Sequence, residues 1–176
     1  LARSPKHQDL VRAEVQGFDP ADPEALERLV WTRAVFEEAM RLFPPAPLFT
    51  RVALKETKIA GRRVPAGTAM LISPWVIHRH RRLWDDPSAF IPERFLPEHR
   101  ERIDRLAYIP FGGGPRVCIG ATFAMQEATI ALATILRSRT LVPIDDVEPV
   151  PAHRITLRPK THIRLKVGHH ATVKSP

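Results

Sequence analysis

The sequence has very little cysteine, and this scarcity limits the kinds of site that it can hold. Cys118 is the single cysteine among 176 residues, so the chain can form no intrachain disulfide and cannot by itself enclose a metal ion in several thiolates. This composition fits a reducing, intracellular setting, and a cytoplasmic protein is therefore the expectation.

Long apolar runs are also missing. The longest, over residues 128–136 and interrupted by threonines, is far shorter than the roughly 20 residues that cross a bilayer. Residues 1–20 lack the pattern of a secretory signal. The chain begins with Leu1, inside an expected helical turn, rather than with Met. We therefore expect a piece of a longer protein, whose preceding segment could carry a membrane anchor.

Basic residues outnumber acidic ones by 27 to 19, which gives a net charge of +8 and a pI near 10.5. A nucleic-acid site would gather its Lys and Arg residues. Here the arginines are scattered from Arg3 to Arg164, and only Arg79, Arg81 and Arg82 crowd together. We therefore expect no nucleic-acid partner. The net positive charge instead favours a surface that binds an acidic electron-transfer protein. A surface whose charge only keeps the protein soluble is the alternative.

Apolar periodicity, punctuated by proline and glycine, predicts an α+β chain. Ser4 and Asp22, each followed by proline, are typical helix starts, and Pro44 and Pro45 end the second helical stretch. The expected helices are residues 5–17, a stretch within 22–43 broken at most once, 73–78 and 119–137. Short β-rich runs predict a small sheet with hairpins over 48–53, 57–59, 62–64 and 68–72, and more strands over 141–144 and 154–167. Residues 84–114 are expected to form a long, packed loop with a functional role.

The strongest local signal is the segment 108–120, which reads Tyr-Ile-Pro-Phe-Gly-Gly-Gly-Pro-Arg-Val-Cys-Ile-Gly. Glycines such as Gly112 and Gly114 allow backbone conformations closed to other residues and a close approach to a flat ligand. Cys118 follows them at the start of the last helix, where the helix dipole and free N–H groups favour a thiolate. The segment therefore predicts a metal-binding thiolate, and a buried, unreactive cysteine is the alternative.

This segment resembles the haem-binding signature of the cytochrome P-450 family, Phe-x-x-Gly-x-Arg-x-Cys-x-Gly. All five fixed positions match, namely Phe111, Gly114, Arg116, Cys118 and Gly120. The resemblance implies that Cys118 is the axial ligand of haem b (iron protoporphyrin IX) and that the other four residues, with Gly112, surround the cofactor. Thiolate ligation pushes electron density onto the iron and favours cleavage of an O–O bond. No catalytic residue other than Cys118 is identifiable.

Two further motifs follow the family in the same order. Glu38 and Arg41 form a Glu-x-x-Arg pair on the helix before Pro44, and Arg94 lies in a Pro-Glu-Arg-Phe motif. The resemblance implies that Glu38, Arg41 and Arg94 are structural residues that together lock the loop carrying the cysteine. Taken alone, the first two would be a solvated surface pair.

Haem carries two propionates, and guanidinium groups pair with carboxylates bidentately. Arg116 of the signature is one candidate. Arg51 is the other, because it matches an arginine that the family places on the first strand after the Glu-x-x-Arg helix, although a surface role is its alternative. Leu48 and Phe49 would line the substrate pocket, or else pack in the core.

Eight histidines raise the question of a second, histidine-based metal site. His78 and His80 are the closest to such a pattern, but a spacing of two directs them apart on a helix and no third ligand stands nearby. We expect solvated or supporting roles for both.

The resemblance runs from Leu1 to Val167. It implies the C-terminal haem-binding part of the mainly α cytochrome P-450 fold over residues 1–167, with a small β-sheet, the cysteine loop and a long following helix, and a tail over 168–176. The parent protein would oxidise a small apolar organic substrate with O2 and two electrons from a ferredoxin or a flavoprotein reductase. A peroxide-using or isomerising haem-thiolate enzyme and a non-catalytic haem-binding remnant are the alternatives. Because the family's distal, oxygen-activating segment is not in this sequence, we expect the 176-residue chain alone to be inactive.

Overall fold

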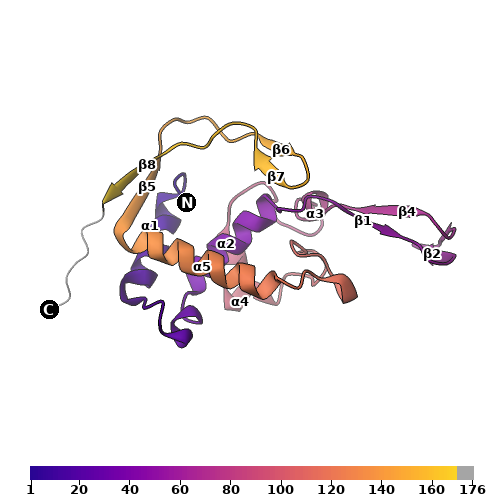
Figure 1. Ribbon diagram of the computed structural model, residues 1–176, viewed down its shortest axis with the longest axis horizontal. Helices are drawn as coiled ribbons and strands as arrows, with labels where there is room; N and C mark the ends of the chain where they lie inside the picture. The colour runs from indigo at the N-terminus through magenta and orange to yellow at the C-terminus, as the bar shows by residue number, and fades with distance from the viewer. Residues whose placement is uncertain (170–176) are drawn as a thin grey trace.

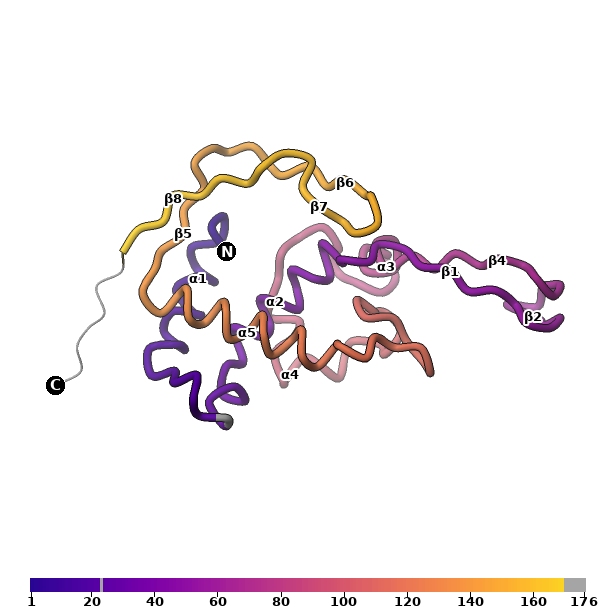
Figure 2. The backbone as a smooth tube through the Cα atoms, viewed as in Figure 1, coloured from indigo at the N-terminus to yellow at the C-terminus, as the bar shows by residue number. Residues whose placement is uncertain are grey.

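Three helices form the body of the chain, which a computed structural model describes over residues 1–169 (Figure 1). They are α1 (Pro5–Glu14), α2 (Val30–Leu42) and α5 (Ala121–Ser138). Two groups of strands extend from this body, one as a long arm and one as an arch above α1 and α2 (Figure 2). Helices with small antiparallel sheets are the predicted α+β class.

α1 and the Pro23–Leu26 turn start at the predicted prolines, but only one of the two predicted capping side chains forms a cap. The second helical stretch is broken once, into a 3-10 turn (Pro23–Leu26) and α2. The Asp22 carboxylate caps that turn by accepting from the N–H of Glu24 at 2.9 Å. The Ser4 hydroxyl instead bonds with Nδ1 of His7 at 2.6 Å, so α1 has no side-chain cap.

The N-terminus of α2 is capped by a residue of another helix. The Glu14 carboxylate, at the end of α1, accepts from the N–H groups of Trp31 and Thr32 at 2.7 and 2.8 Å. It also accepts from the Thr32 hydroxyl at 2.7 Å. A negative charge at a helix N-terminus is favourable and satisfies donors that the helix leaves free. This contact therefore fixes α1 against α2.

Two apolar clusters hold the helices together. The larger one joins the buried faces of α1, α2 and α5 through residues such as Val11, Val35 and Leu136. The second lies where α2 meets the 84–107 segment, and Trp84 and Phe95 are its large aromatic members. The predicted long loop is therefore packed, as expected. It contains short helical turns at Pro92–Phe95, α4 (Pro97–Arg100) and Gly114–Arg116.

The strands form four two-stranded antiparallel ladders rather than one small sheet. In the arm, β1 (Phe49–Val52) pairs with β4 (Ala69–Ile72), and β2 (Thr57–Ile59) pairs with β3 (Arg62–Val64) at the tip. In the arch, β5 (Arg139–Pro143) pairs with β8 (Leu165–His169), and β6 (Pro151–His153) pairs with β7 (Leu157–Pro159). The short helix α3 (Pro74–Ile77) connects the arm to the body.

The C-terminal strand extends past the expected end of the domain. Gly168 and His169 belong to β8 and pair with Thr140 and Arg139, although the sequence assigns them to a tail. The rest of that tail, residues 170–176, lies outside the described residues. Among residues 1–169, no helix is both long enough and apolar enough to span a membrane.

Candidate functional site

The segment 108–120 forms a tight loop directly before α5. The N–H of Cys118 donates to the carbonyl of Phe111 at 2.9 Å, and the N–H of Ala121 donates to the carbonyl of Cys118 at 3.2 Å. Gly112 and Gly114 have φ angles of +78° and +72°, which L side chains rarely adopt. The loop therefore needs glycine at these two positions to return Cys118 to the start of the helix.

Cys118 is a free, exposed cysteine, which argues against the alternative of a buried, unreactive thiol. A Cβ atom built on Gly120 would lie 3.9 Å from Sγ of Cys118, an ordinary van der Waals distance, so Gly120 lies directly beside the sulfur. Ile119, which follows Cys118, and Phe123, in the first turn of α5, have exposed apolar side chains. A flat, apolar ligand lying on Sγ would cover this surface.

The two arginines predicted to pair with carboxylates lie on different elements. Arg116 ends the Gly114–Arg116 turn and is exposed. Arg51 lies on β1, where it donates to the carbonyl of Thr50 at 3.1 Å and stands 4.8 Å over the ring of Phe49. Neither one forms an ion pair with a carboxylate of residues 1–169. Both guanidinium groups are therefore available to the carboxylates of a ligand.

Glu38 and Arg41 form a fully buried ion pair, not a solvated surface pair. Both side chains have no exposed surface. Nε and Nη2 of Arg41 donate to the two carboxylate oxygens of Glu38 at 2.7 and 2.8 Å. The remaining donors reach three backbone carbonyls, those of His78 (2.7 Å), Pro87 (2.7 Å) and Ala89 (2.9 Å). The guanidinium thus uses all its donor directions, which a buried charge requires.

Arg94 completes this cluster from the Pro92–Phe95 turn. Its Nε lies 3.7 Å from Oε1 of Glu38, and its Nη2 donates to the carbonyls of Asp85 and Asp86. The same Glu38 oxygen accepts from the N–H of Ile91 at 2.8 Å. The three charged residues therefore hold residues 78–94 against α2. Among the residues that the structure describes, none of the three hydrogen-bonds to the cysteine loop itself.

The connection to the loop runs through His78, which is fully buried rather than solvated. Its Nε2 accepts from the N–H of Ile109 at 2.9 Å, and its Nδ1 lies 3.2 Å from the carbonyl of Arg41. The pKa of His78 is lowered to about 4, mainly by burial and to a smaller extent by the positive charges of Arg41 and Arg79, although the hydrogen bond to the Arg41 carbonyl opposes this shift. The ring is therefore neutral at pH 7.

Tyr108 provides a second connection between α2 and the loop. Its hydroxyl donates to the carbonyl of Glu37 at 3.1 Å, and its ring packs on Phe95 at 4.7 Å. Burial raises the pKa of Tyr108 well above its ordinary value. Burial also raises the pKa of Glu37, although Arg100 opposes this shift from 2.8 Å. The start of the cysteine loop is thus anchored by an aromatic cluster as well as by His78.

Neither His78 nor Tyr108 was assigned to the site from the sequence. The spacing of four between Pro74 and His78 could have predicted that both lie on one face of the expected helix over residues 73–78. In the structure both residues are buried. His80 is exposed, as expected. Among the described residues, no group of three or more His, Cys, Asp or Glu side chains could hold a metal ion.

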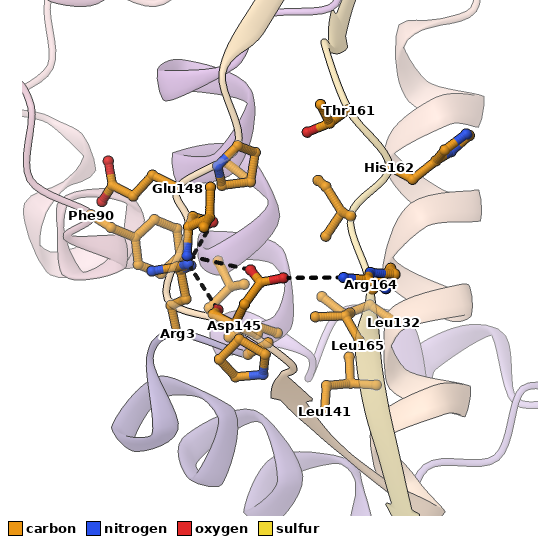
Figure 3. Close-up of a pocket in the computed structure, with 18 of the residues that line it drawn as sticks. Arg3, Phe90, Leu132, Leu141, Asp145, Glu148, Thr161, His162, Arg164 and Leu165 are labelled. Carbon is orange, nitrogen blue, oxygen red and sulfur yellow. Dashed lines mark hydrogen bonds and ion pairs between the residues drawn. The ribbon is translucent and has the colours of Figure 1, made fainter.

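A large cavity is separate from the cysteine loop. It measures about 660 Å³ and lies between α2, α5 and the strands β5 and β8 (Figure 3). Its walls are mostly apolar, and Arg3, Asp145 and Arg164 form a polar edge, where Arg3 donates to the carbonyls of Asp145 (3.2 Å) and Val147 (2.7 Å). None of the site residues predicted from the sequence lines it.

The residues around Cys118 fit a thiolate-ligated haem. The exposed sulfur can supply one soft ligand, and the exposed Ile119 next to it can supply apolar surface to a macrocycle. Arg116 in the loop and Arg51 on β1 have no carboxylate partner among residues 1–169, and guanidinium groups can pair with propionates. These groups are compatible with a thiolate-ligated haem.

Known proteins are similar to this chain over most of its length. The family model described as "Cytochrome P450" matches residues 1–167. Cyclooctatin synthase from Streptomyces melanosporofaciens is 41% identical and covers 100% of the chain, and pentalenene oxygenase from Streptomyces avermitilis is 36% identical over 94% of it. Leukotriene-B4 omega-hydroxylase 3 from Mus musculus is 40% identical over 95%. The chain spans 37%, 38% and 33% of these three relatives, or about a third of their length.

Proposed function

The chain belongs to the cytochrome P450 family, and we propose that it is the haem-binding part of a monooxygenase in which Cys118 ligates the iron of haem b. The observation that carries this proposal is the single, exposed thiol, held by a glycine-rich loop at the start of α5. When bound, the haem supplies the activation of O2. The contribution of this chain is to hold the cofactor and to tune it through the sulfur.

The other loop residues have supporting roles in this proposal. Phe111 and Gly112 form the turn that leads to Cys118, Gly114 provides the second residue with a left-handed φ angle, and Gly120 lies beside the sulfur that would hold the iron. Arg116 and Arg51 would bind the two propionates, because neither has a carboxylate partner among residues 1–169.

Glu38, Arg41 and Arg94 are structural residues in this proposal. They fix the 78–94 segment on which the start of the cysteine loop rests, through the buried ion pair and its backbone contacts. Their effect on the sulfur is therefore indirect. It passes through the contacts of His78 with Ile109 and Tyr108, at the start of the loop.

The reaction follows from the family and from the relatives' names. Two of the three relatives are named as an oxygenase and a hydroxylase. We therefore assign the insertion of one oxygen atom from O2 into a small, apolar organic substrate, with two electrons from a ferredoxin or a flavoprotein reductase. The net charge of +8 favours an acidic donor, since opposite charges raise encounter rates.

The test uses the full-length, haem-loaded protein and two measurements. Its reduced, carbonyl-bound form should show the red-shifted Soret band of thiolate ligation, and Cys118→Ser should lose it. With an electron donor and 18O2, the product should gain one 18O atom. An unshifted band in the wild-type protein would refute the thiolate assignment. Turnover only with peroxide, or product without 18O, would refute monooxygenation and leave the haem site standing.

The 176-residue chain by itself should not turn over substrate. It spans about a third of the length of these relatives, so about two thirds of their residues have no counterpart in it. Hydroxylated product from the purified chain, supplied with haem and an electron donor, would contradict this expectation.

A further inference from the structure

His78 occupies a buried position between α2 and the start of the cysteine loop. It follows the last residue of α3, and its ring lies 5.4 Å from the ring of Tyr108. Its two ring nitrogens face two different backbone groups, the carbonyl of Arg41 at 3.2 Å and the N–H of Ile109 at 2.9 Å. Both partners belong to other elements, so the ring bridges them.

The partners of the ring select one protonation state. The backbone N–H of Ile109 can only donate, so Nε2 must be an unprotonated acceptor. Nδ1 then carries the proton and donates to the carbonyl of Arg41. A doubly protonated ring would place an N–H against the N–H of Ile109 and break this bond. The bridge therefore exists only with neutral imidazole.

The bridge is linked to Cys118 by short steps along the backbone. Ile109, which His78 holds, also accepts through its carbonyl from the N–H of Gly112 at 3.0 Å. Phe111 lies within that turn, and its carbonyl accepts from the N–H of Cys118 at 2.9 Å. On the other side, Arg41 returns a bond to the carbonyl of His78 at 2.7 Å. His78 is thus the hydrogen-bonded link between the Glu38–Arg41 pair and the loop.

We propose that His78 is a positioning residue for the Cys118 thiolate. By accepting a hydrogen bond from the N–H of Ile109, it holds the cysteine loop in a fixed position relative to α2. This inference rests on the proposed function, because it assumes that Cys118 ligates haem. A loop released at Ile109 can shift relative to the iron, so the fraction of haem with a thiolate ligand should fall.

The charged and titratable groups around the ring favour the neutral state that the bridge needs. Arg41 faces it from α2, Arg79 follows it in the chain, and Tyr108 stacks on it from the loop. Two guanidinium groups and full burial all oppose a positive imidazolium. The bridge should therefore be intact at pH 7 and should open in acid.

The test compares three variants in the haem-loaded, full-length protein. His78→Leu fills the space but removes the acceptor, whereas the side-chain oxygen of His78→Gln can accept near the position of Nε2 and does not titrate. His80→Leu, in an exposed neighbour, is the matched control. The readout is the ratio of unshifted to red-shifted Soret band in the reduced, carbonyl-bound protein, measured from pH 8 down through the His78 pKa of about 4.

We expect the leucine variant of His78 to raise this ratio about ten-fold at pH 7, the effect of one lost buried hydrogen bond. His78→Gln and the control should stay near wild type at pH 7. Below about pH 5, as His78 with its pKa of about 4 begins to take up a second proton, the wild-type ratio should rise more steeply than that of His78→Gln.

Three outcomes would overturn the inference. They are a folded, haem-loaded His78→Leu protein with the wild-type ratio, a His78→Gln protein that resembles the leucine variant, or equal acid dependence of His78→Gln and wild type. The last comparison decides the matter even if the leucine variant does not fold. A wild-type protein with no red-shifted band would overturn the proposed function and this inference together, whereas failure in the variants alone would leave the proposed function standing.

Discussion

Replacement of Arg41 by methionine should destabilise the fold severely. The change removes the guanidinium that pairs with Glu38 at 2.7 Å and that also serves the carbonyls of His78, Pro87 and Ala89. Methionine keeps an unbranched apolar stem but is shorter and has no donor. The Glu38 carboxylate would then be buried with no cation closer than Arg94, at 3.7 Å, and three carbonyls would lose a partner.

The magnitude follows from the burial of the pair. Both side chains are completely covered, and removal of one partner from such a pair costs about 3–5 kcal/mol. A loss of about 4 kcal/mol corresponds to roughly a thousand-fold shift of the unfolding equilibrium. Since domains are stable by only about 5–15 kcal/mol, the variant should be close to unfolding at 37 °C. Arg41→Lys should also be destabilised, because an ammonium group has three donors and cannot replace the five hydrogen bonds of the planar guanidinium.

The assay is urea unfolding of the full-length protein, followed by circular dichroism and by the Soret band. The matched control is Arg63→Met, which removes an ion pair of 2.6 Å with Glu56 in the exposed arm and should change little. In a double-mutant cycle, Glu38→Gln combined with Arg41→Met should cost much less than the sum of the single changes. An Arg41→Met variant as stable as the control would refute the reasoning.

Three further changes test other parts of the structure. In acid, stability should fall by about 1.4 kcal/mol per pH unit between pH 6.5 and pH 4, because the unfolded state protonates His78 before the folded state, whose His78 pKa is about 4, and His78→Gln should remove this slope. Glu14→Ala should cost about 1–2 kcal/mol in urea unfolding through loss of the α2 cap, whereas Glu27→Ala, on the exposed surface, should match wild type. Arg116→Gln should speed the transfer of haem to apomyoglobin, and Arg62→Gln, in the arm, should not; equal rates would contradict a role in propionate binding.

The local parts of the fold could be predicted because their causes lie within a few residues. Proline after Ser4 and Asp22 marks the starts of helical segments, and Pro44 follows the end of α2. The arm strands were expected within one or two residues of their observed bounds. Their separation into independent ladders was not expected, because strand alternation does not specify which strands pair.

The predicted cysteine loop has the same local origin. Left-handed φ angles at Gly112 and Gly114 are conformations that the residue type alone permits, so the sequence indicates the turn before Cys118. The order of the motifs along the chain also identifies the family, which a comparison confirms over residues 1–167. Both conclusions need no knowledge of what packs on the loop.

The family, the glycine-rich turn and the cysteine that follows it could therefore be predicted from residue types and their spacing. Tertiary structure alone decided that Glu38 and Arg41 are buried and that His78 joins them to Ile109. The physical reason is that a spacing of three residues places two charges on one helix face but does not say whether that face meets solvent or protein. Burial is set by the 78–94 segment that folds over α2, and it turns an ordinary pair and a neutral histidine into the support of the cysteine loop.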